Sequence, residues 1–212
     1  MAKINVKWVR TDLISVSDQA RDLGFDLRKF DQQDEDVRAA VRKASIDRVV
    51  REVRETWDDA ADPKAKRFSD VRNGVYAISV GDGFGVKYAG GVSEVMYIGR
   101  GVFSNRIRSH LHNWIFDMSR SLRDVSFRFY MGSIGDKRSP ESFKDFEHFL
   151  LDQFREKFGE KPLLNKYAGR EGRIAHEFNG DWNAPMNNRG KNYQWEIRPT
   201  EKNAWFKYYE DE

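Results

Sequence analysis

The chain has 212 residues, of which 39% are hydrophobic, 14% aromatic and 33% charged, a composition that excludes a disordered protein and indicates a folded core under a heavily charged surface. It contains no cysteine, which excludes disulfide frameworks, thiolate zinc sites and cysteine nucleophiles. The net charge is only +3, but residues 11–62 hold nine basic and fourteen acidic side chains, residues 100–138 eight and three, and residues 161–208 nine and five. Basic stretches of this kind suit a polyanion partner, although uneven charge on an ordinary solvated surface is the commoner explanation.

Membrane insertion and export are not expected from this sequence. No stretch approaches the roughly 18 consecutive apolar residues of a membrane span. The first ten residues, MAKINVKWVR, lack the apolar core of a signal peptide. We therefore expect a cytoplasmic protein.

The first 70 residues are predicted to form a mainly helical extension. A short strand is expected at Ile4–Val9, and an amphipathic helix at Val37–Trp57, where apolar residues recur broadly at three- and four-residue spacing. These residues are Val37, Ala40, Val41, Ala44, Val49, Val53 and Trp57. Pro63 and a run of charges then mark a connection into the next unit.

Two strands with a long connection are expected between residues 74 and 99. The segment GVYAISV places Tyr76, Ile78 and Val80 on one side of a strand, and EVMYIG follows as a second strand. The connection contains GDGFG, which is similar to the start of a dinucleotide-binding fingerprint. No helix begins inside these glycines, so a mobile hairpin loop is a better interpretation than a phosphate cradle.

The chain continues with helix, strand and helix. Val102–Phe116 is predicted to be helical, residues 125–131 form a half-buried strand, and Ser139-Pro140-Glu141 opens a helix over Phe143–Phe158 that Gly159 closes. From residue 74 the predicted elements therefore follow in the order strand, strand, helix, strand, helix.

Three units are expected along the chain. The helical extension covers residues 1–70, a central unit covers residues 71–168, and a basic, Asn- and Trp-rich extension covers residues 169–212. The last unit is predicted to mix loops with a strand at Tyr193–Arg198.

Glu147 is the strongest candidate for a chemical role. At about 100° per residue it falls inside the core-facing stripe of its helix rather than opposite that stripe. The stripe consists of Phe143, Phe146, Leu150, Phe154 and Phe158. A buried, unpaired carboxylate costs several kcal/mol, so Glu147 needs a cation, a hydrogen-bond network or a metal. Helical spacing alone leaves a metal ligand and a structural ion pair with an arginine equally open.

Arg106 and His110 lie one turn apart on the preceding helix and can reach the same ligand. Arginine grips phosphate oxygens through a planar fork, and histidine donates or accepts a proton. Taken alone, the pair is also consistent with an exposed helix flank. Tyr76 and Tyr97 lie in strands, where an aromatic side chain is ordinarily part of the core.

Taken together, these residues resemble the GIY-YIG nuclease family. The resemblance rests on six pieces in order: Gly74-Val75-Tyr76, Tyr97-Ile98-Gly99, Arg106, His110, Glu147, and the Pro162-to-Asn165 segment of KPLLN. It covers roughly residues 74 to 165. The chain departs from the family in a longer gap between the tyrosine motifs and in Val75, which replaces isoleucine. Neither departure removes a catalytic group.

The resemblance implies a small α+β domain in which a three-stranded antiparallel sheet is flanked by helices, and the order of the predicted elements fits it. It implies that Glu147 binds one Mg²⁺ or Mn²⁺ ion, which polarises the phosphate and stabilises the leaving 3′ oxygen. Tyr76 would orient or deprotonate the attacking water, and Arg106 would neutralise charge on the phosphate. Tyr97 and His110 would hydrogen-bond the phosphate or water.

Further residues are expected to support this site or contact the substrate. Asn165, Gly74 and Gly99 would brace it rather than react. Candidate nucleic-acid contacts are Arg100, Arg108, Arg189 and Lys191, the last two in an Asn-rich loop that ordinary turns also explain.

The expected substrate is double-stranded DNA, cut to 5′-phosphate and 3′-hydroxyl ends. The extensions are modest and lack zinc-finger cysteines, which favours a compact, sequence-specific restriction-type enzyme, with a homodimer to cut both strands. The alternatives are a structure-specific repair or phage nuclease and a catalytically silent nucleic-acid-binding module.

Overall fold

The computed structural model describes residues 2–60, 66–81, 83–122, 124–134, 141–167, 176–187, 193–202 and 206. Two of the predicted nucleic-acid contacts, Arg189 and Lys191, lie outside these residues.

The central sheet has four antiparallel strands in the order β2 (Val9–Arg10), β7 (Phe127–Ser133), β3 (Gly74–Val80) and β6 (Val95–Gly101). All seven residues of β3 are buried, as its central place between two long neighbours requires. Strand β6 lies at the edge, so one side of its backbone is available to other parts of the chain. The predicted hairpin of β3 and β6 is confirmed.

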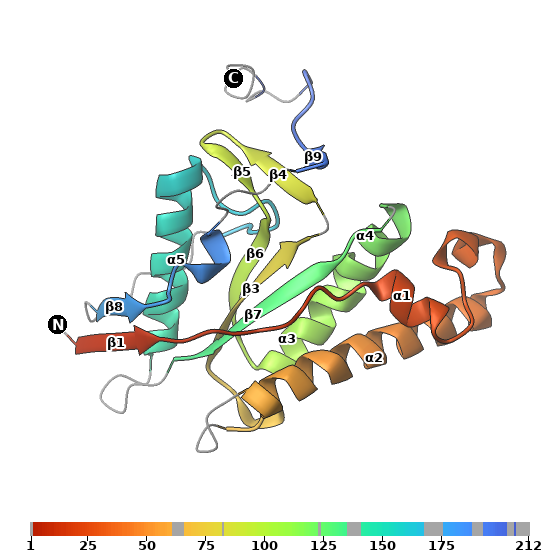
Figure 1. Cartoon of the computed structure of the whole chain (residues 1–212), viewed down its shortest axis with the longest axis horizontal. Coiled ribbons are helices and arrows are strands. Elements are labelled where there is room, and N and C mark those ends of the chain that lie inside the picture. Colours follow the sequence, from red (N-terminus) through yellow and green to blue (C-terminus); the bar gives the residue numbers. More distant parts are fainter. Residues whose placement is uncertain are drawn as a thin grey trace.

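Helices cover both faces of this sheet (Figure 1). Helix α5 (Ser142–Phe158) packs on β3 and β6 from one side, and α3 (Phe103–His110) and α2 (Glu35–Ala60) lie on the other. The predicted helices at Val37–Trp57 and Phe143–Phe158 are therefore confirmed. Gly159 ends α5 with a φ of 82°, a left-handed conformation that favours glycine. The N-cap of α5 is Glu141, while the predicted opening at Ser139-Pro140 lies outside the described residues.

The predicted helix at Val102–Phe116 is longer and less regular than expected. Helix α3 runs into a π-helical turn, η3 (Leu111–Ile115), and then into α4 (Phe116–Ser121). A π turn inserts an extra residue into the helix and changes the direction of the side chains around it.

The smaller helices belong to the N- and C-terminal parts of the chain. They are α1 (Val16–Arg21), η1 (Leu27–Gln32), η2 (Phe68–Asp70) and η4 (Ala184–Met186).

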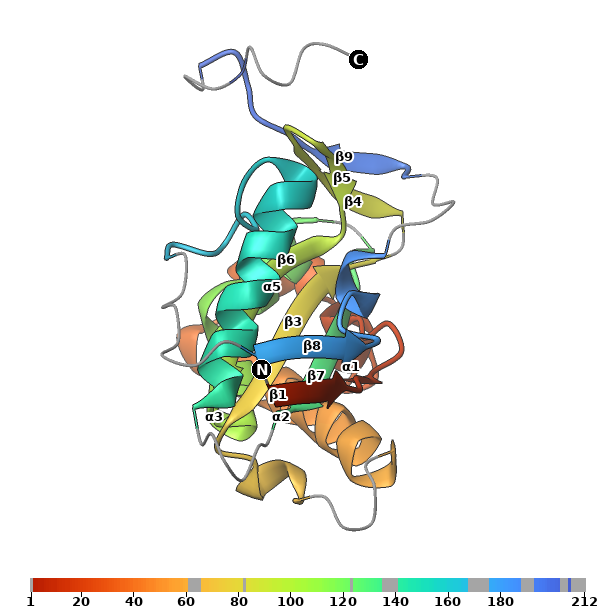
Figure 2. The same cartoon turned by 90° about the vertical axis from the view of Figure 1, so that its left-hand side faces the viewer.

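Two smaller sheets join distant parts of the chain. Strand β1 (Ala2–Val6) runs parallel to β8 (His176–Gly180), and the two lie side by side across the lower part of α5 (Figure 2). Strand β4 (Phe84–Tyr88) pairs with β5 (Gly91–Ser93) and with β9 (Trp195–Ile197). The connection between β3 and β6 was expected to be a mobile loop, and this expectation is wrong, because β4 and β5 make it a β-hairpin that a third strand extends.

The α+β class is confirmed, and the described residues form a central sheet of four strands and two smaller sheets rather than one sheet of three. The fourth strand is the two-residue β2, which comes from the N-terminal extension and pairs with β7. The long helix α2 is held to the centre by aromatic packing, since the Trp57 and Phe103 rings meet edge to face with centroids 5.1 Å apart. Within the described residues, no helix is both long and apolar enough to cross a membrane.

Candidate functional site

The two motif tyrosines lie side by side on adjacent strands. Tyr76 in β3 is paired in register with Gly99 in β6, and the rings of Tyr76 and Tyr97 stack with centroids 6.0 Å apart. Gly99 makes this arrangement possible. A Cβ at position 99 would lie 2.4 Å from Cε1 of Tyr97 and 2.9 Å from Oη of Tyr76. Gly74 lets β3 pack closely against α3, because a Cβ at position 74 would lie 2.0 Å from the Phe103 ring.

Arg106 joins the two tyrosines. Its Nε donates a hydrogen bond to Oη of Tyr76 and its Nη2 donates another to Oη of Tyr97, each at 3.1 Å. Arg106 lies in the first turn of α3, which begins two residues after β6 ends, so the short connection brings the guanidinium back over the strand. A guanidinium fixed at two nitrogens is held in one orientation, and its other N–H groups remain available to a ligand.

His110 links Trp114 to Tyr76 through its two ring nitrogens. Trp114, one turn later in the π segment, donates from Nε1 to Nδ1 of His110 at 2.9 Å, and Nε2 of His110 lies 2.9 Å from Oη of Tyr76. Because Nδ1 accepts a hydrogen bond, the neutral ring carries its proton on Nε2 and donates to Tyr76. Burial, with a contribution from Arg106, lowers the pKa of His110 to about 4. The ring is therefore neutral at physiological pH.

Tyr76 is the buried centre of this network. Its side chain is inaccessible to solvent, and its hydroxyl oxygen receives hydrogen bonds from both His110 and Arg106. Burial and the neighbouring Tyr97 raise the pKa of Tyr76 well above the usual value, and Arg106 only partly opposes this. The phenol therefore stays protonated at neutral pH, and its geometry suits holding Arg106 in place rather than taking a proton from water.

A cleft of ≈ 600 Å³ opens at the β6 edge of the sheet. Residues on opposite sides of the sheet meet there, because an edge strand lets side chains from both faces reach one space. The lining residues are Tyr97, Arg100, Arg106, Glu147, Leu151, Leu164, Asn165, Lys166 and Tyr167. Of the five catalytic residues predicted from the sequence, Tyr97, Arg106 and Glu147 thus line the cleft, and Tyr76 and His110 lie behind it.

Glu147 projects from α5 into this cleft and pairs with Arg100. The two side chains are 13% and 25% exposed, and Oε2 of Glu147 lies 2.9 Å from Nη1 of Arg100. The arginine ion pair that the sequence left open is therefore present. Burial nevertheless raises the pKa of Glu147, in spite of the opposing fields of Arg100 and Arg106. The carboxylate would still gain from a further cation.

Glu147 is the residue of this cleft whose carboxylate could hold a divalent cation. Among the described residues, no group of three or more histidine, aspartate or glutamate side chains is placed to hold a metal ion, so Glu147 would be a single protein ligand. Mg²⁺ commonly binds in this way, because it keeps several waters and takes its other oxygens from substrate phosphates.

Asn165 closes the free edge of β6. Its Oδ1 accepts a hydrogen bond from the backbone N–H of Ile98 at 2.9 Å, and its Nδ2 donates to the carbonyl of Ile98 at 2.7 Å. One amide side chain thus takes the place of a neighbouring strand. Ile98 lies between Tyr97 and Gly99, so this contact fixes the strand at the point where the tyrosine network is built.

The remaining sequence predictions have mixed outcomes. Arg108, predicted to contact nucleic acid, is ion-paired to Asp47 of α2 at 2.5 Å and does not line the cleft. Arg100 was predicted only as a nucleic-acid contact, and its pairing with Glu147 was missed. The supporting role of Trp114 was also missed, although its spacing of one turn from His110 was a readable signal. Nothing in the sequence pattern singled out Lys166 or Tyr167.

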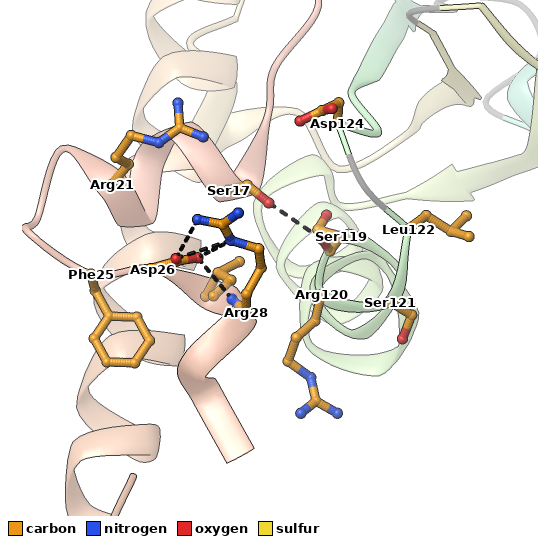
Figure 3. A pocket seen from close by; sticks show the side chains of 11 residues that line it. Ser17, Arg21, Phe25, Asp26, Arg28, Ser119, Arg120, Ser121, Leu122 and Asp124 are labelled. Atoms are coloured by element: carbon orange, nitrogen blue, oxygen red, sulfur yellow. Dashed lines mark hydrogen bonds and ion pairs between the residues drawn. The ribbon is translucent and has the colours of Figure 1, made fainter. Parts of the chain in front are cut away.

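A second hollow of ≈ 270 Å³ lies between the N-terminal helices and α4 (Figure 3). Its charges largely satisfy one another: Asp26 accepts hydrogen bonds from the side chain and the backbone of Arg28, and these lower the pKa of Asp26 to about 2. Ser17 donates to the carbonyl of Ser119 at 3.3 Å. The hollow therefore has the features of surface packing rather than of a reactive site.

No family model, curated protein or solved structure matched the chain.

Proposed function

We propose that the chain is a GIY-YIG-type endonuclease that hydrolyses DNA phosphodiester bonds with Mg²⁺ or Mn²⁺. The observation that carries the proposal is the placement of Arg106. Its side chain is hydrogen-bonded to the hydroxyls of Tyr76 and Tyr97 and lines the same cleft as Glu147. These residues come from four separate elements, β3, β6, α3 and α5. The convergence of one carboxylate, one fixed guanidinium and one phenol at one edge of a sheet, with a second phenol buried behind them, suits phosphoryl chemistry.

Charge in the cleft supports binding of a phosphodiester. Among the described residues, its lining includes three basic residues, Arg100, Arg106 and Lys166, and one acidic residue, Glu147. A phosphate held by Arg106 would have its developing negative charge stabilised by a group that needs no reorganisation, because Tyr76 and Tyr97 already orient it. A divalent ion bound at Glu147 would supply polarisation of the phosphate and stabilisation of the leaving 3′ oxygen.

The roles that we assign to Tyr97, Tyr76 and His110 depend on whether each side chain lines the cleft or is buried behind it. Tyr97 lines the cleft, so its hydroxyl is the group to hold the attacking water or a phosphate oxygen. Tyr76 and His110 lie behind it, and we assign both to the positioning of Arg106. The resemblance implied that Tyr76 orients or deprotonates the attacking water. Its burial opposes deprotonation of water. The products would carry 5′-phosphate and 3′-hydroxyl ends.

Two substrate classes follow from the proposal. A restriction-type enzyme would act on sites in duplex DNA, with two copies of the chain to cut both strands. A structure-specific nuclease would act on branched or damaged DNA. The second class is favoured by an exposed aromatic residue at the cleft, Tyr167.

The proposal is tested by incubating the protein with plasmid, phage DNA, flapped oligonucleotides and RNA in Mg²⁺, Mn²⁺ or EDTA. We expect cleavage of at least one DNA that requires the metal and is lost on Glu147→Ala, while nucleic-acid binding is retained. Metal-dependent binding without cleavage of any substrate would favour the silent binding module instead.

A further inference from the structure

Tyr167 is the most exposed large apolar side chain in the described part of the chain. It is 83% exposed and lines the same cleft as Arg106 and Glu147. A single exposed aromatic residue is ordinary on a protein surface. An aromatic ring at the rim of a cleft with a positive net charge has a further use, because its flat face can stack on an anionic ligand that the cations attract.

The segment before Tyr167 is anchored firmly. The backbone N–H of Leu163 donates to Oη of Tyr88 at 2.9 Å, and that of Leu164 donates to the carbonyl of Met96 at 3.0 Å. Asn165 adds its two hydrogen bonds to Ile98. Tyr167 follows Asn165 by two residues, so its Cα lies within about 7.6 Å of the Cα of Asn165. The ring therefore stays beside the cleft although it is exposed.

The neighbours of Tyr167 suit a nucleic-acid strand. Lys166 precedes it, and Arg100 and Arg106 line the same cleft. Proteins that bind single-stranded nucleic acid combine cations that follow the backbone with aromatic rings on which bases stack. Stacking needs an accessible base face, and bases inside an uninterrupted duplex do not offer one.

We propose that Tyr167 stacks on an unpaired nucleobase next to the scissile phosphate. The substrate class is then DNA with an unpaired nucleotide at the cut, such as a flap, loop or single strand. This inference rests on the proposed nuclease function, since it takes the position of the scissile phosphate from that proposal. Lys166 and Arg100 would hold the flanking phosphates of the same strand.

The test uses Glu147→Gln protein, so that DNA is bound without being cut, and compares Tyr167→Ala with Tyr167→Phe in that background. The probe is a flapped oligonucleotide with 2-aminopurine as the unpaired base, beside a fully paired duplex of the same length. Trp195→Ala is the matched control, because Trp195 is 63% exposed, stacks on Phe84 and lies outside the cleft. Thermal unfolding of each variant shows that the fold is kept.

We expect Tyr167→Ala to weaken binding of the flapped DNA by about 5- to 150-fold, which corresponds to about 1–3 kcal/mol per stacked base. It should also abolish the quenching of 2-aminopurine. Tyr167→Phe and Trp195→Ala should keep both signals, and binding of the paired duplex should change little. Equal weakening for flap and duplex, or unchanged quenching in Tyr167→Ala, would overturn the inference.

Cleavage of the same two DNAs by protein with Glu147 intact separates this inference from the nuclease proposal. Quenching that depends on Tyr167 without any cleavage would retain the stacking contact and reject the nuclease. Cleavage that proceeds while neither flap binding nor quenching depends on Tyr167 would reject the stacking contact alone. Absence of DNA binding would reject both.

Discussion

Arg100 and Glu147 form an ion pair of 2.9 Å inside the cleft, with both side chains largely shielded from solvent. Arg100 reaches Glu147 because β6 is an edge strand beside α5. The pair places a guanidinium where a metal ion bound by Glu147 would have to approach. Arg100 and the metal would therefore compete for the same carboxylate.

Replacing Arg100 should strengthen metal binding. We expect Arg100→Gln to raise the affinity for Mn²⁺ by at least roughly fivefold, because even an exposed ion pair contributes up to about 1 kcal/mol and this pair is shielded from solvent. Titration of Mn²⁺ followed by electron paramagnetic resonance measures this directly. Arg108→Gln is the control, since Arg108 pairs with Asp47 outside the cleft. An unchanged Mn²⁺ affinity in Arg100→Gln would place the metal elsewhere.

The two hydrogen bonds of Arg106 to the tyrosines predict that its shape, and not only its charge, is required. Arg106→Lys keeps the charge but replaces the planar fork, whose Nε and Nη2 each bind one hydroxyl, with a single nitrogen. We expect a loss of about 10²–10³-fold in the rate constant for DNA cleavage, similar to the loss of one fixed donor in other enzymes. Single-turnover kinetics check this. Near-normal rates in Arg106→Lys would mean that Arg106 contributes charge alone.

The buried state of His110 predicts a pH dependence of stability. Its folded pKa of about 4 lies below the roughly 6.5 of an unfolded histidine, so the unfolded chain binds more protons between these values. Stability from His110 is therefore complete above about pH 6.5 and is lost as pH falls toward 4, by roughly 3 kcal/mol.

Denaturant unfolding of wild type and His110→Gln between pH 4 and 7 measures this contribution. The stability difference between the two proteins should grow with pH across that window. The opposing effect of Glu147, whose raised pKa favours the folded state at low pH, is common to both proteins and cancels in the difference. His112→Gln, at the exposed histidine nearby, should follow wild type. A constant difference between wild type and His110→Gln would contradict the buried, neutral assignment.

Gly99 is predicted to be required for the geometry of the network. In Gly99→Ala the new Cβ would meet the Tyr97 ring and the Tyr76 hydroxyl, and a displacement near 1 Å at a reacting group costs roughly 10²-fold in rate. We expect that loss with binding of DNA largely kept. Gly91→Ala is a contrasting variant. Its new Cβ would meet no atom within 4 Å, so any effect of this substitution comes from backbone strain at a φ of 126° and not from a steric clash. Cleavage assays at equal folded concentration decide the comparison.

Helical and strand periodicity predicted much of the fold and part of the site. The spacing of phenylalanines placed Glu147 inside the buried stripe of α5, and the one-turn separation of Arg106 and His110 placed them on one face of α3. Such predictions depend only on local geometry, which a sequence carries directly.

Other features depend on contacts between distant segments, and no local pattern predicts them. The pairing of β1 with β8 joins residues about 170 positions apart. The connection with GDGFG forms a hairpin of β4 and β5, and β9, about 110 residues later in the chain, extends it. The ion pair of Arg100 with Glu147 and the hydrogen bonds of Asn165 to the backbone of Ile98 form because β6 is an edge strand. The order of strands in a sheet is a tertiary property. The placement of Tyr167 at the cleft follows from the same anchoring.

The most direct test of the central claim is single-turnover cleavage of one DNA substrate in Mg²⁺ by wild type, Glu147→Gln and Glu156→Gln. Both variants remove one carboxylate charge from α5, but Glu156 is exposed and lies outside the cleft. We predict that Glu156→Gln cleaves as wild type does and that Glu147→Gln binds the DNA without cutting it. Equal cleavage by the two variants would contradict a metal-dependent phosphodiesterase centre at Glu147.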